Sequence, residues 1–300
     1  MQNCNLKDIF TENFPDVKTN RELFSIFNKN PKIDKYYITT SAIPERRKKI
    51  SSIFNDFREY ASKHFLTELR KDFHARTWEM YLSVILLKNN LKIKVSRKDK
   101  WPDIIIDNIA NIECVTCQNA QDPTKPDFVP QLRIGIVSDV PRDQILLRIS
   151  NSISSKYQKY MKSYKKDNSK LPFIIAINSG IFGLHQNGIF PIILDYTNGV
   201  DNIVVNFERK GLDVRSTGLT ITTRDSIQKG LSTIDSNIFG NDKYKEISAI
   251  IFSSNLIINT PDLLGSDLLL IKNKFAENPL GNDLDFIQQP KNKRYKIRFM

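Results

Sequence analysis

Acidic residues interrupt two apolar segments in the middle of the sequence. Asp103 begins the run DIII, and Glu113 lies inside NIECVT. Strand side chains alternate between faces, so a turn at residues 107–109 would place Asp103 opposite Glu113, with Cβ atoms about 5 Å apart. Two carboxylates this close repel each other unless a cation lies between them, and oxygen ligands suit Mg²⁺ or Mn²⁺. The pair therefore predicts a divalent metal site.

A third acid, Glu79, lies in the segment that most clearly predicts a helix, FLTELRKDFHARTWEMYLSVILLKNN (65–90). From this helix its carboxylate could reach the same metal ion. Each acid also has a purely structural interpretation. Glu79 could be a solvent-facing helix residue, Asp103 could cap a strand turn, and Glu113 could be a charge that protects an edge strand from aggregation.

A helix acid, then Pro-Asp, then Glu on the neighbouring strand resembles the PD-(D/E)XK nuclease superfamily. The matching residues are Glu79 in HARTWEMYLSVIL, Asp103 in WPDIII and Glu113 in NIECVT, and the resemblance covers residues 65–200 or so. It implies a restriction-endonuclease-like core and metal-dependent hydrolysis of DNA, with all three acids holding Mg²⁺ or Mn²⁺.

The chain departs from the superfamily pattern at residue 115. Members carry a lysine two residues after the glutamate, whereas this chain has Val115, which should share Glu113's face of the strand. On the following helix, a polar stripe recurs every four residues: Gln144, Arg148, Ser152 and Lys156. Superfamily members with a displaced lysine place it on this helix. The resemblance therefore implies Lys156 as the migrated lysine, with Arg148 helping to stabilise the phosphate. A solvated basic face near the helix end is the alternative.

The hydrophobic patterns predict a mixed α/β fold, with a small mixed central sheet flanked by helices. Strands are expected at 91–95, 103–106, 111–116, 171–178, 188–196, 202–207 and within 246–257. The second helix, at 141–166, should bury one apolar side against the sheet: Ile145, Ile149, Ile153, Tyr157 and Tyr160. We expect a helical N-terminal extension (1–60), the nuclease-like core (61–260) and a C-terminal segment packing on that core (261–300).

The chain is strongly basic, with a net charge of +12 and an isoelectric point near 9.4. This balance favours a polyanionic partner, DNA in the first instance, although a basic surface without such a partner is the alternative. The loop before Asp103 supplies Arg97, Lys98 and Lys100 as candidate phosphate contacts, and Lys159 on the second helix is another.

The N-terminal sequence predicts no secretory signal, and the most apolar region is broken by polar residues, so no membrane span is expected. The three cysteines fit a reducing cytoplasm. Cys114 and Cys117 have the spacing of a redox or zinc pair, but the sequence offers no second such pair, and we interpret them as small core residues. The oligomeric state is open, with a homodimer as one arrangement.

Two functions of different classes follow. The first is a Mg²⁺-dependent endonuclease, in restriction or another defence against foreign DNA. The second is a nuclease-fold module that binds nucleic acid or docks a partner without catalysis, and Val115 is the residue that favours it. No phosphate-binding loop, nucleophile elbow or dinucleotide fingerprint is found in the sequence, which disfavours an NTPase, a serine hydrolase or a Rossmann oxidoreductase.

Overall fold

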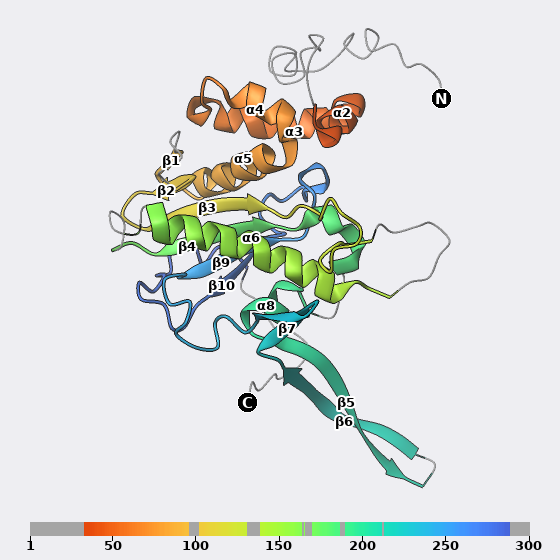
Figure 1. The fold of residues 1–300 in the computed structure, drawn as a ribbon. Coiled ribbons are helices and arrows are strands. Elements are labelled where there is room, and N and C mark those ends of the chain that lie inside the picture. The colour runs from red at the N-terminus through yellow and green to blue at the C-terminus, as the bar shows by residue number, and fades with distance from the viewer. Residues whose placement is uncertain are drawn as a thin grey trace, which may run out of the picture.

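The computed structural model describes residues 33–95, 102–130, 139–163, 165, 170–186, 190–211 and 213–288. A mixed six-stranded sheet lies at the centre, with strand order β1-β2-β3-β4-β9-β10. Helices cover both of its faces (Figure 1). The arrangement confirms the predicted class, an α/β fold with helices at its N-terminal side.

The sheet combines an antiparallel half with a parallel half. Its strands are β1 (Ile93–Val95), β2 (Ile104–Ile106), β3 (Ala110–Thr116), β4 (Phe173–Asn178), β9 (Ala249–Ser253) and β10 (Leu269–Lys272). The first three strands form an antiparallel meander. The pairs β3–β4 and β4–β9 are parallel, and β10 is antiparallel to β9. All six residues of β4 are buried, as expected for a central strand covered on both faces.

The register between β2 and β3 agrees with the sequence prediction. Ile104 pairs with Ile112 and Ile106 pairs with Ala110, so the residue before β2, Asp103, lies opposite Glu113 when the register is continued by one step. The turn occupies residues 107–109, where Asn108 adopts a positive φ of 58°. Asparagine tolerates this left-handed conformation better than most residues, which favours a tight turn here.

One face of the sheet is covered by α5 (Phe73–Lys88), and the other N-terminal helices lie on the outer side of α5 (Figure 1): α2 (Lys35–Ala42), α3 (Pro44–Phe57), the short η2 (Arg58–Tyr60) and α4 (Phe65–Lys71). They share one apolar core with the sheet. The single helix predicted over 65–90 is wrong in one respect, because it is divided into α4 and α5 at Asp72. The Asp72 side chain accepts a hydrogen bond from the Ala75 amide and so caps the start of a new helix.

The other face is covered by α6 (Arg142–Ser163), with η3 (Gly180–Gln186) and α8 (Ile193–Thr197) beside it. The predicted apolar side of α6 is confirmed: Ile145, Ile149, Ile153 and Tyr160 are buried and Tyr157 packs against the same core. The strand predicted at 188–196 is wrong, because residues 193–197 form α8. Pro191 precedes that helix, and its carbonyl accepts a hydrogen bond from the Leu194 amide, which starts a helical turn.

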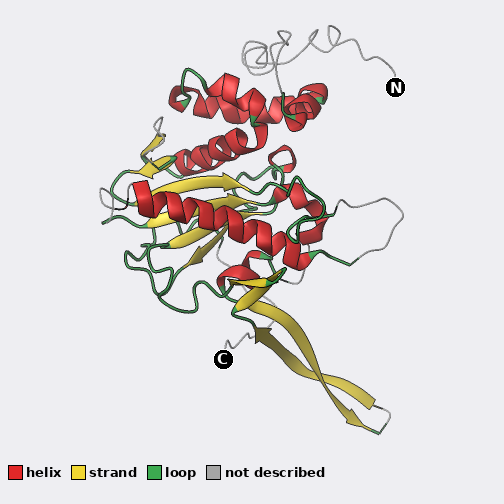
Figure 2. Cartoon of the chain, in the orientation of Figure 1, coloured by secondary structure: helices red, strands yellow, loops and turns green. Residues whose placement is uncertain are grey.

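Two hairpins are inserted between β4 and β9. The long one consists of β5 (Val200–Lys210) and β6 (Asp213–Thr223), and the short one of β7 (Ser226–Lys229) and β8 (Ser232–Asp235). The predicted strand at 202–207 lies inside β5, which is longer than expected. Figures 1 and 2 show the β5–β6 hairpin extending away from the body as an arm.

The segment after residue 261 contributes a strand to the sheet. Between β9 and β10 the chain forms the short helix η4 (Ile257–Asn259), and β10 then pairs with β9 along its whole length. The sequence prediction of a C-terminal segment packing on the core did not include this strand. Within the described part of the chain, none of the helices combines the length and apolar character needed to span a bilayer.

Candidate active site

The centre of the site is a buried carboxylate on β3. The Glu113 side chain is 0 % exposed and faces α6. Its Oε2 accepts a hydrogen bond from Lys156 Nζ at 2.6 Å, and its Oε1 accepts one from Lys159 Nζ at 2.9 Å. A buried carboxylate is costly unless charged donors compensate it, and here two ammonium groups do so.

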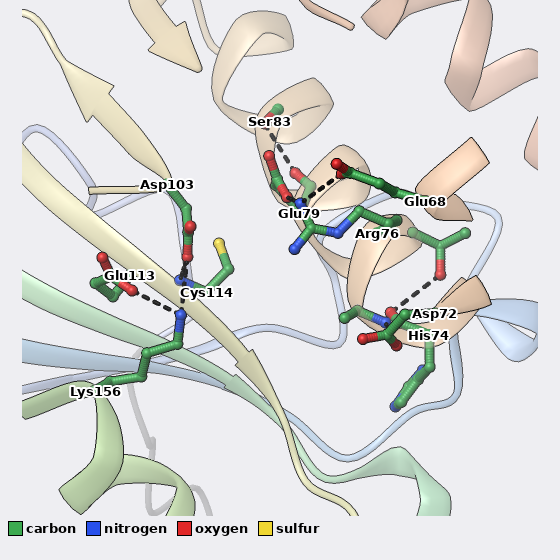
Figure 3. A network of polar contacts seen from close by, with 12 residues as sticks. Glu68, Asp72, His74, Arg76, Glu79, Ser83, Asp103, Glu113, Cys114 and Lys156 are labelled. Atoms are coloured by element: carbon green, nitrogen blue, oxygen red, sulfur yellow. Dashed lines mark hydrogen bonds and ion pairs between the residues drawn. The ribbon is translucent and has the colours of Figure 1, made fainter. Parts of the chain in front are cut away.

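Asp103 completes the cluster from the neighbouring strand. Its Oδ2 accepts hydrogen bonds from Lys156 Nζ at 3.2 Å and from the Cys114 amide at 2.8 Å (Figure 3). The hydrogen bond from the Cys114 amide holds the Asp103 carboxylate against β3, at the residue that precedes β2. Because one ammonium nitrogen contacts both Asp103 and Glu113, the oxygens of the two carboxylates converge on a single point.

Lys156 contacts both acids. Burial by itself would lower the pKa of its ammonium group, but the carboxylates of Asp103 and Glu113 outweigh burial and raise that pKa. The lysine stays protonated, with its side chain 19 % exposed. Val115 faces the same side of β3 as Glu113 and packs against the core beneath α6.

Lys159 was predicted only as a contact for nucleic acid, turned away from the polar stripe. The structure shows that it reaches Glu113 directly. Residues three apart on a helix lie on neighbouring parts of its surface, so the spacing of Lys156 and Lys159 was a usable signal.

Arg148 was expected to help Lys156, but its contacts lie elsewhere. Its Nε donates to the Gln118 carbonyl at 2.6 Å and its Nη1 pairs with Asp127 at 2.9 Å. Asp127 also accepts a hydrogen bond from Asn151. Arg148 thus ties the loop after β3 to α6, about two turns of helix away from Lys156.

Glu79 lies on α5 and forms its nearest ion pair with Arg76, at 2.7 Å. Burial raises the pKa of Glu79 to about 7, Arg76 opposes that shift, and Asp103 reinforces it. The two carboxylates are therefore electrostatic neighbours. Figure 3 shows Glu79 on a separate side of the network, with Arg76 beside it, so the structure does not bring Glu79 into contact with Asp103 and Glu113.

Asn111 is a residue that sequence reasoning missed. It precedes Glu113 by two positions on β3, so both side chains face α6. Asn111 is 0 % exposed, and neither polar atom of its amide has a hydrogen-bond partner in the described part of the chain. An unsatisfied buried amide is rare, and a polar residue inside a strand that also carries Glu113 was the signal for it.

The cysteines behave as core residues. Cys114 belongs to the core beneath α5 and Cys117 to the core beneath α6, and both are free thiols. Burial, reinforced by Asp103, raises the pKa of the Cys114 thiol, and burial raises the pKa of Cys117 to about 12. Neutral thiols on opposite faces of the sheet do not form a chelating pair.

The chemistry of the donors fits a hydrated Mg²⁺ or Mn²⁺ ion. Among the described residues, no three His, Cys, Asp or Glu side chains gather into a ready metal site. Mg²⁺, however, is commonly held by one or two carboxylates while it keeps water molecules and binds substrate phosphate. Asp103 and Glu113 supply such a pair, because their oxygens already converge on one cationic atom.

The predicted phosphate contacts Arg97, Lys98 and Lys100 lie outside the described residues. Comparison with known proteins gives no match to a protein-family model, to a curated protein or to a solved structure.

Proposed function

We propose that this chain is a Mg²⁺- or Mn²⁺-dependent nuclease that hydrolyses phosphodiester bonds in DNA, with a site of the PD-(D/E)XK kind. The observation that carries the proposal is the convergence of Asp103, Glu113 and the Lys156 ammonium at the junction of β2, β3 and α6. The order of elements supports it as well, because an antiparallel meander leads through α6 to the parallel strand β4.

In this mechanism Asp103 and Glu113 would hold the metal, and Glu79 would contribute a third charge from α5. When bound, the metal would polarise a phosphoryl oxygen and lower the pKa of the attacking water. Lys156 gives up one carboxylate contact and turns its ammonium group toward the phosphate, where negative charge develops. Lys159 then remains on Glu113 and keeps that buried carboxylate compensated.

The basic character of the chain supports a polyanionic substrate. A net charge of +12 attracts phosphates over long range and accelerates encounter with nucleic acid. A role in restriction or defence is part of the proposal and rests on the resemblance.

A second candidate is a nuclease-fold module that binds nucleic acid without cleaving it. Two observations favour it: Val115 at the usual lysine position, and the neutralisation of Glu113 by two lysines. In that case the ion pairs hold β3 and α6 together and no metal enters.

The deciding experiment measures cleavage of supercoiled plasmid and of single-stranded DNA with Mg²⁺ or Mn²⁺, against EDTA. A nuclease gives metal-dependent products that disappear in the Asp103→Asn and Glu113→Gln variants. Both substitutions keep the shape of the side chain and remove its charge, so circular dichroism should show the same fold. Metal-dependent cleavage that survives in both variants would place the active site elsewhere. Binding without cleavage under every metal condition would select the second candidate.

A further inference from the structure

The β5–β6 arm is fixed at its base and unsupported beyond it. Val200 is buried at the start of β5, and Ile221 near the end of β6 packs against the core beneath α6. Arg224, just after β6, pairs with Asp143 of α6 at 2.6 Å and with Asp201 of β5 at 3.5 Å. With 11 residues in each strand, the hairpin is roughly 36 Å long, and Figure 1 shows both strands running away from the body.

Two apolar residues of β5 are exposed on the arm. Phe207 is 64 % exposed and Val204 is 44 % exposed. Exposed aromatic and aliphatic side chains on one projecting element are typical of a protein–protein contact.

The edges of the arm are also open. Within the described residues, β5 and β6 pair only with each other, so each strand has one row of backbone groups without a neighbouring strand. A two-stranded hairpin is marginally stable alone in water and gains stability from further strands or packing. Open edges of this length are templates for pairing with another chain.

The charges on the arm argue against nucleic acid as its occupant. The acids Asp201, Glu208 and Asp213 are balanced by the bases Arg209, Lys210 and Arg215, although the whole chain carries +12. An arm that bound DNA would need more basic than acidic side chains, because it would have to neutralise phosphate groups. Balanced charge is instead what a self-complementary surface requires, because each acid can face a base of an identical partner.

We propose that the β5–β6 arm is a dimerisation element, and that it pairs with the same arm of a second copy of this chain. Two identical strands that run antiparallel are related by a twofold axis, so the contact closes and stops at two copies. Pairing through β5, the strand that carries Val204 and Phe207, covers one open edge of each arm and places these residues beside the same residues of the partner. The proposal does not depend on catalysis and extends the chain's properties beyond the proposed nuclease activity.

The test is the molar mass in solution, measured by light scattering over a wide range of protein concentration. The wild type should have twice the chain mass of 34.7 kDa. The double variant Val204→Ser/Phe207→Asp should have the mass of one chain, because it removes both exposed apolar groups and places like charges near the axis. Leu231→Ser and Leu263→Ser are matched controls, since both leucines are exposed apolar residues away from the arm. Both control variants should remain dimers.

Thermal melting and circular dichroism establish that the arm variant is folded, which is expected because both residues are exposed. A second measurement uses Phe207→Cys under mild oxidation, which should trap a covalent dimer. A wild type that stays monomeric at every concentration, or an arm variant that stays dimeric, would overturn the proposal. A monomeric wild type whose DNA affinity falls in the arm variant would assign the arm to nucleic acid instead. Because mass is measured without substrate, failure here is separate from failure of the nuclease assay.

Discussion

Glu113 is enclosed between two ammonium groups from the same helix, and this arrangement decides what each lysine can do. Lys156 contacts Asp103 as well as Glu113, whereas Lys159 forms an ion pair with Glu113. Removal of one lysine leaves the other to compensate the buried carboxylate. The two lysines can therefore be tested separately without leaving Glu113 unpaired.

In the proposed mechanism the charge of Lys156 acts on the transition state, so Lys156→Ala should lower the rate of metal-dependent cleavage by about 10²–10³-fold with little loss of DNA affinity. Single-turnover cleavage and equilibrium binding measure the two effects. Lys162→Ala is the control: it removes an exposed lysine from the same helix and should leave the rate near that of the wild type. An equal fall in cleavage rate in both variants would show that the lysines of α6 contribute only their positive charge and that Lys156 has no specific role.

Asn111 offers a test of stability at the same strand. Asn111→Leu keeps a similar shape and removes an amide that has no partner among the described residues. We expect the free energy of unfolding to rise by about 1–2 kcal/mol, as measured by urea denaturation. A fall instead would indicate that the amide is hydrogen-bonded through water. Lost cleavage together with raised stability would identify Asn111 as a residue kept for function.

The carboxyl of Glu79 should make stability depend on pH. Burial raises its pKa in the folded chain to about 7, above its ordinary value of 4.5. The folded state therefore binds this proton more tightly, so the stabilisation is complete below about pH 4.5 and is lost as the pH rises through about 7. Glu79→Gln should reduce the fall in the free energy of unfolding between about pH 5 and about pH 8. Burial also raises the pKa of Asp195, to about 6, so this residue lowers stability with rising pH as well. The Glu79→Gln variant should therefore keep part of the pH dependence of its free energy of unfolding. Identical slopes in wild type and variant would contradict the shift at Glu79.

At the scale of the element, β3 and α6 act as one unit. Because the two elements pack together, Val115 contacts the core beneath α6, and Lys156 reaches Glu113 on the same face of β3.

Val115→Lys should restore part of the cleavage lost in the Lys156→Ala protein, since residues 113 and 115 share one face of β3. Plasmid cleavage by the double variant, compared with each single variant, measures this rescue. Val115 is only partly buried, so the lysine can be accommodated by extending its ammonium group toward solvent. An inactive wild type that becomes active through Val115→Lys alone would identify the chain as a binding module that lost its catalytic cation.

Local patterns predicted the elements around the site well. The β2–β3 turn, the opposition of Asp103 and Glu113, and the buried side of α6 all follow from alternation or helical spacing, which involve neighbouring residues. The break at Asp72 and the helix at 193–197 were missed because capping and burial overrode the hydrophobic pattern. The double contact of Glu113 depends on how α6 packs across β3, a long-range property that spacing alone does not fix.

At the scale of the whole molecule, the net charge of +12 has a measurable consequence. Binding through phosphates releases counterions, so affinity for DNA should fall steeply as salt rises. Replacing Arg97, Lys98 and Lys100 with alanine should make the slope of log affinity against log salt shallower by about two to three. Titrations at several salt concentrations measure it, and a wild-type slope near zero would leave the basic surface without a polyanionic partner.

The position of the hairpins in the chain also bears on how the protein can change over evolutionary time. β4 and β9 are adjacent in the sheet, yet residues 179–248 separate them in sequence. The free-energy cost of closing a flexible loop rises only with the logarithm of its length, by about 0.6 kcal/mol for each doubling. Parts of this interval, such as Ile193, Tyr196 and Ile227, belong to the core beneath α6, but the β5–β6 arm projects from it, so insertion and deletion within the arm cost the sheet little. The residues proposed for catalysis all precede residue 160, so the arm can change in length while β2, β3 and α6 remain under separate selection.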